Sequence, residues 1–327
     1  MKAWRNLRRR FLTPDVAQTR LDVRGFHVKN QEARVRLETV GSSFLRGFGE
    51  AAEAARVPDA DPGLDNVARA YRGFAYEGAA MGFAIRDAVG VGGRRVAEFL
   101  QRHDEHVYMA YVGVGWAMAR LPRPLWSRLH APDPLLRWLV LDGYGFHQAY
   151  FKTTRYVGRA DRESSFPWPQ AGPGAYRLRA IDQGIGRACW FVAGTDPRVL
   201  TQIFDRFAAP RLPDLWAGAG LAATYAGGAD ERELRLLRDL AGRYAGDLAQ
   251  GSAFAAGARV RAGLVVPHNE LATQVFCALP VEAASKVTDD ARADLPPDGV
   301  LPAYEHWRQR IKAALMPTGS ETKVERK

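Results

Sequence analysis

Residues 215–242 read LWAGAGLAATYAGGADERELRLLRDLAG, and this stretch decides the predicted fold. Its second half places Leu234, Leu237, Leu240 and Ala241 on one face of a helix, because they recur with the helical period. Its first half carries glycines between apolar residues. Glycine inside a helix costs about 1 kcal/mol relative to alanine, so these glycines need a packing reason. Close contact between two helices supplies one, and we interpret the stretch as a helix–turn–helix unit.

Similar glycine-bearing segments recur along the whole chain. They start at Gly47, Gly78, Gly113, Gly143, Gly184, Gly218 and Gly251. Most steps are close to 34 residues, and the longest contains the loop ESSFPWPQAGPG at 163–174. Such a period is typical of helix–turn–helix repeats. We therefore predict an all-α fold, a helical-repeat array of about seven units that forms either an open superhelix or a closed α/α toroid.

Composition and charge narrow the class of protein further. The chain has 327 residues and a net charge of +10, half of which lies in the first ten residues, MKAWRNLRRR. A nucleic-acid-binding protein more often spreads its charge over a folded face, so we expect no nucleic-acid partner. No apolar run is long enough to span a membrane, and the two cysteines form no close pair. These features predict a cytoplasmic protein with no cofactor and no metal.

The pattern also predicts three segments. Residues 1–12 form a basic N-terminal arm, residues 13–316 form the helical-repeat domain, and residues 317–327 form a disordered tail. The arm alternates apolar residues with arginines at helical spacing, a pattern typical of helices that contact anionic membrane surfaces or acidic proteins. Docking of the arm as a cap on the first repeat is the alternative.

Several long segments resemble one uncharacterised bacterial family. They are FAYEGAAMGF (74–83), LDGYGFHQAYF (141–151), AIDQGIGRACWFVAG (180–194), LWAGAGLAATYAGG (215–228) and LAQGSAFAA (248–256). The family is a domain of unknown function whose members recur in enediyne polyketide biosynthetic gene clusters. The resemblance runs from about residue 11 to residue 315. It implies a role in maturing a polyketide-derived polyene, and it supplies no active site.

Polar residues stand immediately before several of the recurring glycines. If each glycine segment begins a helix, these residues lie near helix N-termini and face one rim of the array. Carboxylates and amides placed there could bind a ligand or act in acid–base catalysis. The alternative is that they cap the helices and form hydrogen bonds between repeats. The candidates are Glu77, Asp142, Asp182, Gln183 and Gln250.

One histidine and four aromatic residues complete the candidate site. His147 follows Asp142 by five residues, which turns the two side chains about 140° apart on a helix. A direct pair is therefore not expected, and Asp182 is the proposed partner of His147. A hydrogen-bonded core histidine is the alternative. The candidate substrate-binding aromatics are Tyr76, Tyr144, Trp190 and Trp216.

These observations lead to one functional hypothesis with two rivals. We predict an enediyne-type biosynthesis protein that binds a lipophilic polyene intermediate in an internal cleft. The features favour an enzyme that performs acid–base chemistry on that molecule. The rivals are a non-catalytic scaffold that binds another biosynthetic protein, and a self-resistance protein that sequesters a reactive product. A closed cavity lined by Glu77, Asp142, His147 and aromatics would favour ligand binding.

Overall fold

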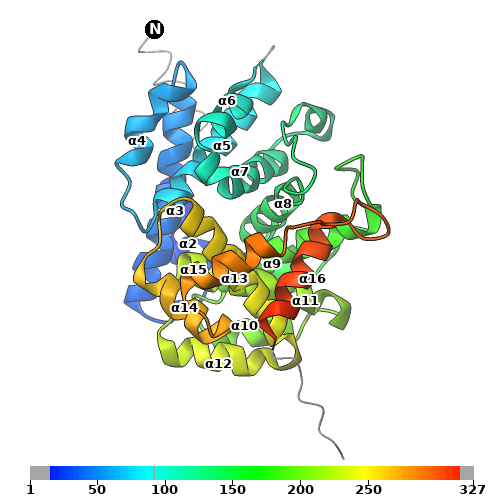
Figure 1. Cartoon of the computed structure of the whole chain (residues 1–327). Coiled ribbons are helices and arrows are strands. Elements are labelled where there is room, and N and C mark those ends of the chain that lie inside the picture. Colours follow the sequence, from blue (N-terminus) through cyan, green and yellow to red (C-terminus); the bar gives the residue numbers. More distant parts are fainter. Residues whose placement is uncertain (1–14, 91–92, 317–327) are drawn as a thin grey trace, which may run out of the picture.

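The computed structural model describes residues 15–90 and 93–316, which fold into α-helices joined by loops and short 3₁₀ turns (Figure 1). No β-strand occurs within these two ranges. The structure therefore confirms the all-α prediction. The predictions made for residues 1–12 and 317–327 lie outside the described residues.

The recurring glycines all lie inside long helices, and each of these helices packs against the next one in the series. The series is α3 (Gln31–Glu53), α5 (Arg72–Val89), α7 (Val107–Arg120), α8 (Trp138–Phe151), α9 (Arg177–Val192), α11 (Leu212–Ala226) and α13 (Ala245–Arg261).

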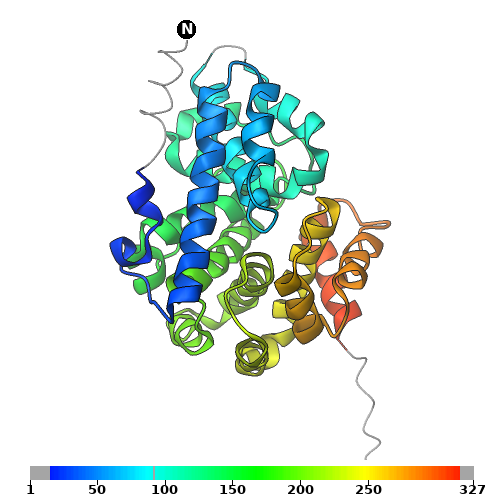
Figure 2. The ribbon, with the colours of Figure 1, turned by 90° about the vertical axis from the view of Figure 1, so that its left-hand side faces the viewer.

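Shorter helices connect this series or cover it. They are α2 (Leu21–Arg24), α4 (Asp61–Asp65), α6 (Arg95–Arg102), α10 (Pro197–Phe204), α12 (Glu231–Ala241), α14 (Pro267–Cys277), α15 (Val281–Asp290) and α16 (Ala303–Leu315). Figure 2 shows α3 running along one side of the molecule, with α14, α15 and α16 grouped together on the other.

The glycines bring the backbones of neighbouring helices into contact. A Cβ atom on Gly184 of α9 would lie 1.8 Å from the carbonyl oxygen of Asp142 in α8. A Cβ atom on Gly145 of α8 would lie 2.1 Å from the carbonyl oxygen of Ile181 in α9. No side chain larger than hydrogen fits at these positions without moving a helix. The predicted reason for the glycines, close helix–helix contact, is confirmed.

Segments far apart in sequence also meet. The backbone N–H of His27 donates to the carbonyl oxygen of Val192 at 3.0 Å. From α13, Arg259 Nη2 donates to the carbonyl oxygen of Ala70 at 3.0 Å. The array of helices therefore curves far enough for its later members to contact the segments that precede its earlier ones.

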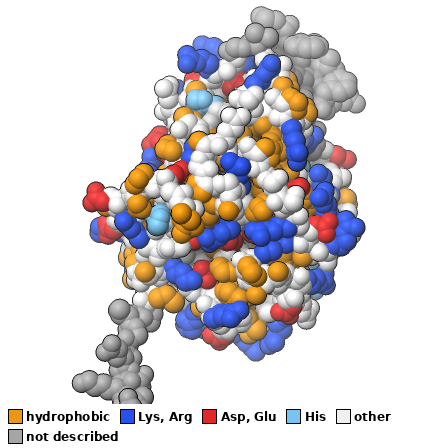
Figure 3. All heavy atoms as spheres, turned by 90° about the vertical axis from the view of Figure 1, so that its right-hand side faces the viewer, with side chains coloured by type: hydrophobic (Ala, Val, Ile, Leu, Met, Phe, Trp, Pro, Cys, Tyr) orange, Lys and Arg blue, Asp and Glu red, His pale blue; other side chains and the backbone are white. Residues whose placement is uncertain are grey.

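The surface carries charge of both signs. Figure 3 shows one face on which Lys and Arg side chains are spread among hydrophobic atoms and fewer acidic side chains. Every helix in the described part of the chain is too short or too polar to cross a membrane.

Candidate functional site

Helical periodicity directs a set of side chains from the glycine-bearing helices toward a shared interior. Phe74, Glu77 and Met81 of α5 are spaced three and four residues apart, so they share one face of the helix. Arg187 and Phe191 share a face of α9 for the same reason. All five residues line one of the two apolar pockets of the interior.

A buried arginine joins two of the predicted carboxylates. Arg187 forms an ion pair with Asp142, and its Nη2 lies 3.9 Å from Glu77 Oε1. Gln183 Nε2 donates to Asp142 Oδ2 at 2.8 Å and lies 3.3 Å from the Tyr304 hydroxyl. Glu77 and Asp142 are only 2% and 1% exposed. One guanidinium thus serves two carboxylates that are almost fully shielded from solvent.

Burial changes the protonation of Glu77. Burial raises the pKa of Glu77, attraction to Arg187 lowers it and repulsion from the Asp142 carboxylate raises it, and the net result is a pKa of about 7. The side chain of Trp116 also lowers the pKa of Glu77 slightly, although no acceptor lies within full hydrogen-bond distance of its Nε1. Glu77 is therefore poised to take up or release a proton near neutral pH, the property that a general acid or base needs.

Glu77 faces the first apolar pocket, which we call the Glu77 pocket. It encloses about 690 Å³ of empty space, counted to its open mouth, and is narrow. Helices α3, α5, α7, α8 and α9 contribute its walls. The aromatic and histidine side chains in these walls are Phe44, Phe74, Trp116, Phe146, His147, Tyr150, Phe151 and Phe191.

A second apolar pocket, which we call the Tyr225 pocket, lies against the first. It also encloses about 690 Å³, and its lining includes Tyr225, Asp142, Phe254 and Trp307. Phe74, Arg187 and Phe191 line both pockets. The two spaces are therefore adjacent, with the Glu77–Arg187–Asp142 cluster at their junction.

Three pocket-lining side chains have polar atoms without partners. Trp116 Nε1 and His147 Nδ1 in the Glu77 pocket and the Tyr225 hydroxyl in the Tyr225 pocket are buried and make no hydrogen bond among the described residues. The Tyr225 hydroxyl is pressed against Gly73, where a Cβ atom would lie 2.0 Å away. An unmade hydrogen bond of a buried polar group costs about 1–3 kcal/mol, so a ligand that offers an acceptor would be stabilised here.

His147 lies in the wall of the Glu77 pocket among aromatic rings. Its ring centre is 4.7 Å from that of Phe151 and 5.5 Å from that of Trp116. Burial and, to a smaller extent, the cations Arg120, Lys152 and Arg24 together lower the pKa of His147 to about 3. The imidazole is therefore neutral at pH 7. Its Nδ1 has no hydrogen-bond partner within the described chain.

The structure contradicts the proposed pairing of His147 with Asp182. Asp182 is fully buried and accepts hydrogen bonds from Arg211 Nη2 at 2.7 Å and Nε at 3.1 Å. Arg162 lies 3.2 Å from its other oxygen. The carboxylate is thus occupied by two arginines and lines neither pocket. Its contacts tie α9 to the segment before α11, which is a structural role.

Of the structural alternative for these polar residues, helix capping is wrong, whereas hydrogen bonding between neighbouring elements is found. Helix α5 begins at Arg72 and α8 begins at Trp138, so Glu77 and Asp142 lie in the second turn of their helices. Asp182, Gln183 and Gln250 lie in the second turn of α9 or α13 for the same reason. Backbone N–H groups beyond the first turn already have intrahelical partners, so these side chains bond to other helices instead.

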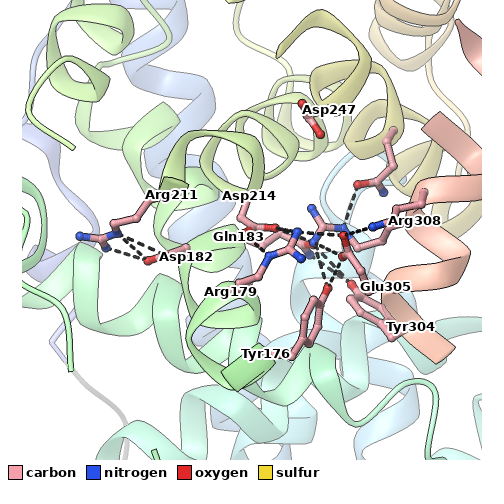
Figure 4. Close-up of polar contacts among 12 residues, drawn as sticks. Tyr176, Arg179, Asp182, Gln183, Arg211, Asp214, Asp247, Tyr304, Glu305 and Arg308 are labelled. Carbon is pink, nitrogen blue, oxygen red and sulfur yellow. Dashed lines mark hydrogen bonds and ion pairs between the residues drawn. The ribbon is translucent and has the colours of Figure 1, made fainter. Parts of the chain in front are cut away.

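The last helix completes the polar interior (Figure 4). Arg308 of α16 donates to Asp214 Oδ1 at 2.7 Å, to Gln250 Oε1 at 3.0 Å and to the Tyr176 hydroxyl at 2.9 Å. Arg179 bonds Asp214 and Glu305 from the other side. These contacts hold α16 against α9, α11 and α13. Gln250 therefore serves this tether, although its Nε2 makes no hydrogen bond among the described residues.

The predicted substrate-binding aromatics lie outside both pockets. The Tyr76 hydroxyl donates to Asp65 Oδ1, and its ring stacks on His106. Trp190 Nε1 donates to the carbonyl oxygen of Gly227. Tyr144 packs against Trp126 and Phe166, and Trp216 packs against Phe204. Adjacent residues of a helix point about 100° apart, so a neighbour in sequence does not share the face of Glu77 or Asp142.

Sequence reasoning missed the residues that join the predicted carboxylates to the pockets, above all Arg187 and Phe74. A signal for Arg187 was present, because it stands among small and apolar residues in GIGRACW at 184–190. A charged residue in such a helix must be buried and paired. Among the described residues, no three His, Cys, Asp or Glu side chains gather in a way that could hold a metal ion.

Fold and site together define the class: an all-helical protein with a buried two-carboxylate, one-arginine cluster between two apolar pockets. The chain belongs to the family described as Protein of unknown function (DUF1702), whose model matches residues 3–315. No curated protein and no solved structure matches the chain.

Proposed function

We propose that this protein binds a slender lipophilic molecule in the Glu77 and Tyr225 pockets and performs acid–base chemistry on it at Glu77. A polyene intermediate of an enediyne-type pathway is the ligand that we favour. The observation that carries the proposal is the position of Glu77, a carboxyl with a pKa of about 7 in the wall of a narrow apolar pocket.

The shape of the interior supports an extended ligand. Two adjoining narrow pockets share Phe74, Arg187 and Phe191, so a long, thin chain could pass from one to the other past these side chains. Contacts such as that between Arg259 and the carbonyl oxygen of Ala70 support a closed helical array around the pockets rather than an open superhelix. Because the walls are largely apolar, burial of hydrocarbon supplies the binding free energy, about 25 cal/mol for each Å² removed from water.

The proposed chemistry is proton transfer. Ionised Glu77 removes a proton from one carbon of a conjugated chain, and protonated Glu77 returns a proton to another carbon, which moves a double bond and leaves the composition unchanged. Arg187, 3.9 Å from the carboxylate, stabilises the ionised form. Because the pocket opens to solvent, the proton on Glu77 exchanges with water between the two steps, so that solvent hydrogen enters the product.

The experiment combines genetics with isotope labelling. Deletion of the gene should cause a polyene to accumulate, and that compound is then incubated with purified protein in D₂O. We expect deuterium to enter the polyene, as measured by mass spectrometry, and we expect Glu77→Gln to abolish the exchange. Glu282→Gln, at an exposed carboxylate of α15, is the matched control and should exchange at the wild-type rate.

The same experiment separates the rival functions. A sequestration protein would bind the polyene in the pockets without exchanging its protons, so binding with no deuterium uptake would overturn the enzymatic proposal. A scaffold for another biosynthetic protein would not bind the polyene at all. Asp142→Asn is a second probe, because it removes one of the two carboxylates that Arg187 contacts.

A further inference from the structure

The Glu77 pocket adjoins a cationic depression on the surface. Phe151 lines both spaces. Besides Phe151, the depression is lined by four basic residues, Arg24, Lys152, Arg155 and Arg159. Arg120 is exposed and lines the Glu77 pocket itself. An apolar interior therefore meets a positively charged surface at the Phe151 side chain.

Three of these cations have no acidic partner among the described residues. Arg155 and Arg159 each lie 3.5 Å from Asp161. By contrast, in the described part of the chain no carboxylate lies within ion-pair distance of Arg24, Arg120 or Lys152. Glu38 is the acidic side chain that raises the pKa of Tyr150, which also lines the Glu77 pocket, and this carboxylate is paired with Arg34. Unpaired cations beside an apolar pocket favour an anionic ligand group.

Arg24 is held in place at this mouth. Its Nη2 donates to the carbonyl oxygen of Tyr150, and its Nη1 donates to Gln18 Oε1 at 3.1 Å. The guanidinium carbon lies 4.9 Å from the centre of the Phe151 ring, within the range of a cation–π interaction. Arg24 Nε is buried without a hydrogen-bond partner. One donor of this guanidinium thus has no partner in the described part of the chain.

The charges inside the protein set the direction of the ligand. Glu77 in the Glu77 pocket and Asp142 in the adjoining Tyr225 pocket both face the cation Arg187, which lines both pockets. A second anion placed there would meet two carboxylates. At the mouth, the groups that act on His147 are the cations Arg120, Lys152 and Arg24. An anionic group is therefore favoured at the mouth, with the apolar chain directed inward.

We propose that the ligand is an anionic amphiphile, whose carboxylate or phosphate lies among Arg24, Arg120 and Lys152 while its apolar chain occupies the Glu77 pocket. This inference rests on the proposed function, because it assumes that the pocket takes a lipophilic chain. It adds the chemical class of the ligand's polar end and places that end where Phe151 lines both the Glu77 pocket and the surface depression.

Direct binding of a fluorescent conjugated tetraenoic fatty acid and of its methyl ester tests the inference. We expect the acid to bind the wild-type protein about tenfold more tightly than the ester, and we expect added salt to weaken only the acid, because exposed ion pairs are screened. The double variant Arg120→Gln/Lys152→Gln should lose most of this tenfold preference and keep its affinity for the ester. Arg232→Gln, an exposed site on α12, is the control.

Competition identifies the anion. Stronger displacement of the tetraenoic acid by dodecyl phosphate than by dodecanoic acid assigns a phosphate to the mouth, and the reverse order assigns a carboxylate. Displacement by neither, or equal binding of acid and ester to the wild-type protein, overturns the inference and leaves the proposed function intact. If neither the acid nor the ester binds, the proposed function itself fails.

Discussion

Replacement of Gly184 by alanine tests whether the close helix contact defines the fold. The added Cβ would lie 1.8 Å from the carbonyl oxygen of Asp142 and 2.8 Å from the backbone nitrogen of Phe146, whereas such contacts essentially never fall below 3.0 Å. Helices α8 and α9 must therefore separate locally by about 1.2 Å. Because the obstacle is backbone, no side-chain rotation relieves it.

The magnitude follows from two opposing effects. Overpacking of this kind costs about 1–3 kcal/mol, and an immovable backbone places Gly184→Ala at the upper end. The higher helix propensity of alanine returns about 1 kcal/mol. We expect a net loss of about 2 kcal/mol in the free energy of unfolding, or roughly 3 °C in Tm for a chain of this size.

Urea unfolding followed by circular dichroism measures this loss, and Gly246→Ala provides the matched control. The atoms nearest to a Cβ on Gly246 of α13 belong to the flexible side chains of Lys312 and Met316, at 3.0 Å and 3.0 Å, and none of these atoms is backbone. That variant should stay within about 0.5 kcal/mol of the wild type. If Gly184→Ala proves as stable as Gly246→Ala, the glycine contact does not fix the separation of the two helices.

Three further predictions concern buried charges and thiols. Folded Glu77 holds its proton more tightly than the unfolded chain does, with a pKa of about 7 against 4.5, so the stability due to its protonation is lost as pH rises through that range. Glu77→Gln should therefore be up to about 3 kcal/mol more stable than wild type at pH 8 and little different at pH 5. Equal unfolding curves of the two proteins at both pH values would contradict this. Arg308→Met should cost about 3–5 kcal/mol in urea unfolding, because it leaves the buried Asp214 and Glu305 carboxylates short of a cation, whereas a wild-type midpoint would show that the tether of α16 is dispensable. Burial raises the pKa of Cys189 well above its usual range and that of Cys277 to about 12, so neither thiol should react with a disulfide reagent before the protein unfolds, and rapid labelling of the native protein would refute that burial.

The helices were predictable because their signal is local. The spacing of Leu234, Leu237 and Ala241 marks one face of α12, and the structure buries these three residues. The glycines were informative for a related reason, since a costly residue repeated inside helices needs a neighbouring backbone. The residue at which each helix begins was harder to predict from the sequence. Helix α5 starts at Arg72, more than one turn before the glycine segment at which the sequence analysis predicts its start. For this reason, residues that lie inside the helix were predicted to be helix caps.

Part of the candidate site was also within reach of the sequence. Glu77, Asp142 and His147 were selected for their chemistry, and the structure places all three in the walls of the two pockets. Their partners were not within reach, because each contact joins residues from different helices. The pairing of Asp182 with Arg211, for example, depends on how the segment before α11 approaches α9. Helix periodicity alone contains no such information.

Arg187 shows how charge and packing together determine the chemistry of the site. The close approach of α8 and α9 at Gly184 brings the second turn of α8 against α9 and leaves Arg187 only 5% exposed. A guanidinium in that position requires a carboxylate, and the interior supplies two, Asp142 and Glu77. Two carboxylates facing one cation leave one negative charge uncompensated in a water-poor site. The least costly remedy is a proton on one of them. Glu77 lies farther from the guanidinium than Asp142 does, so it takes that proton and becomes the residue that can exchange it with a ligand.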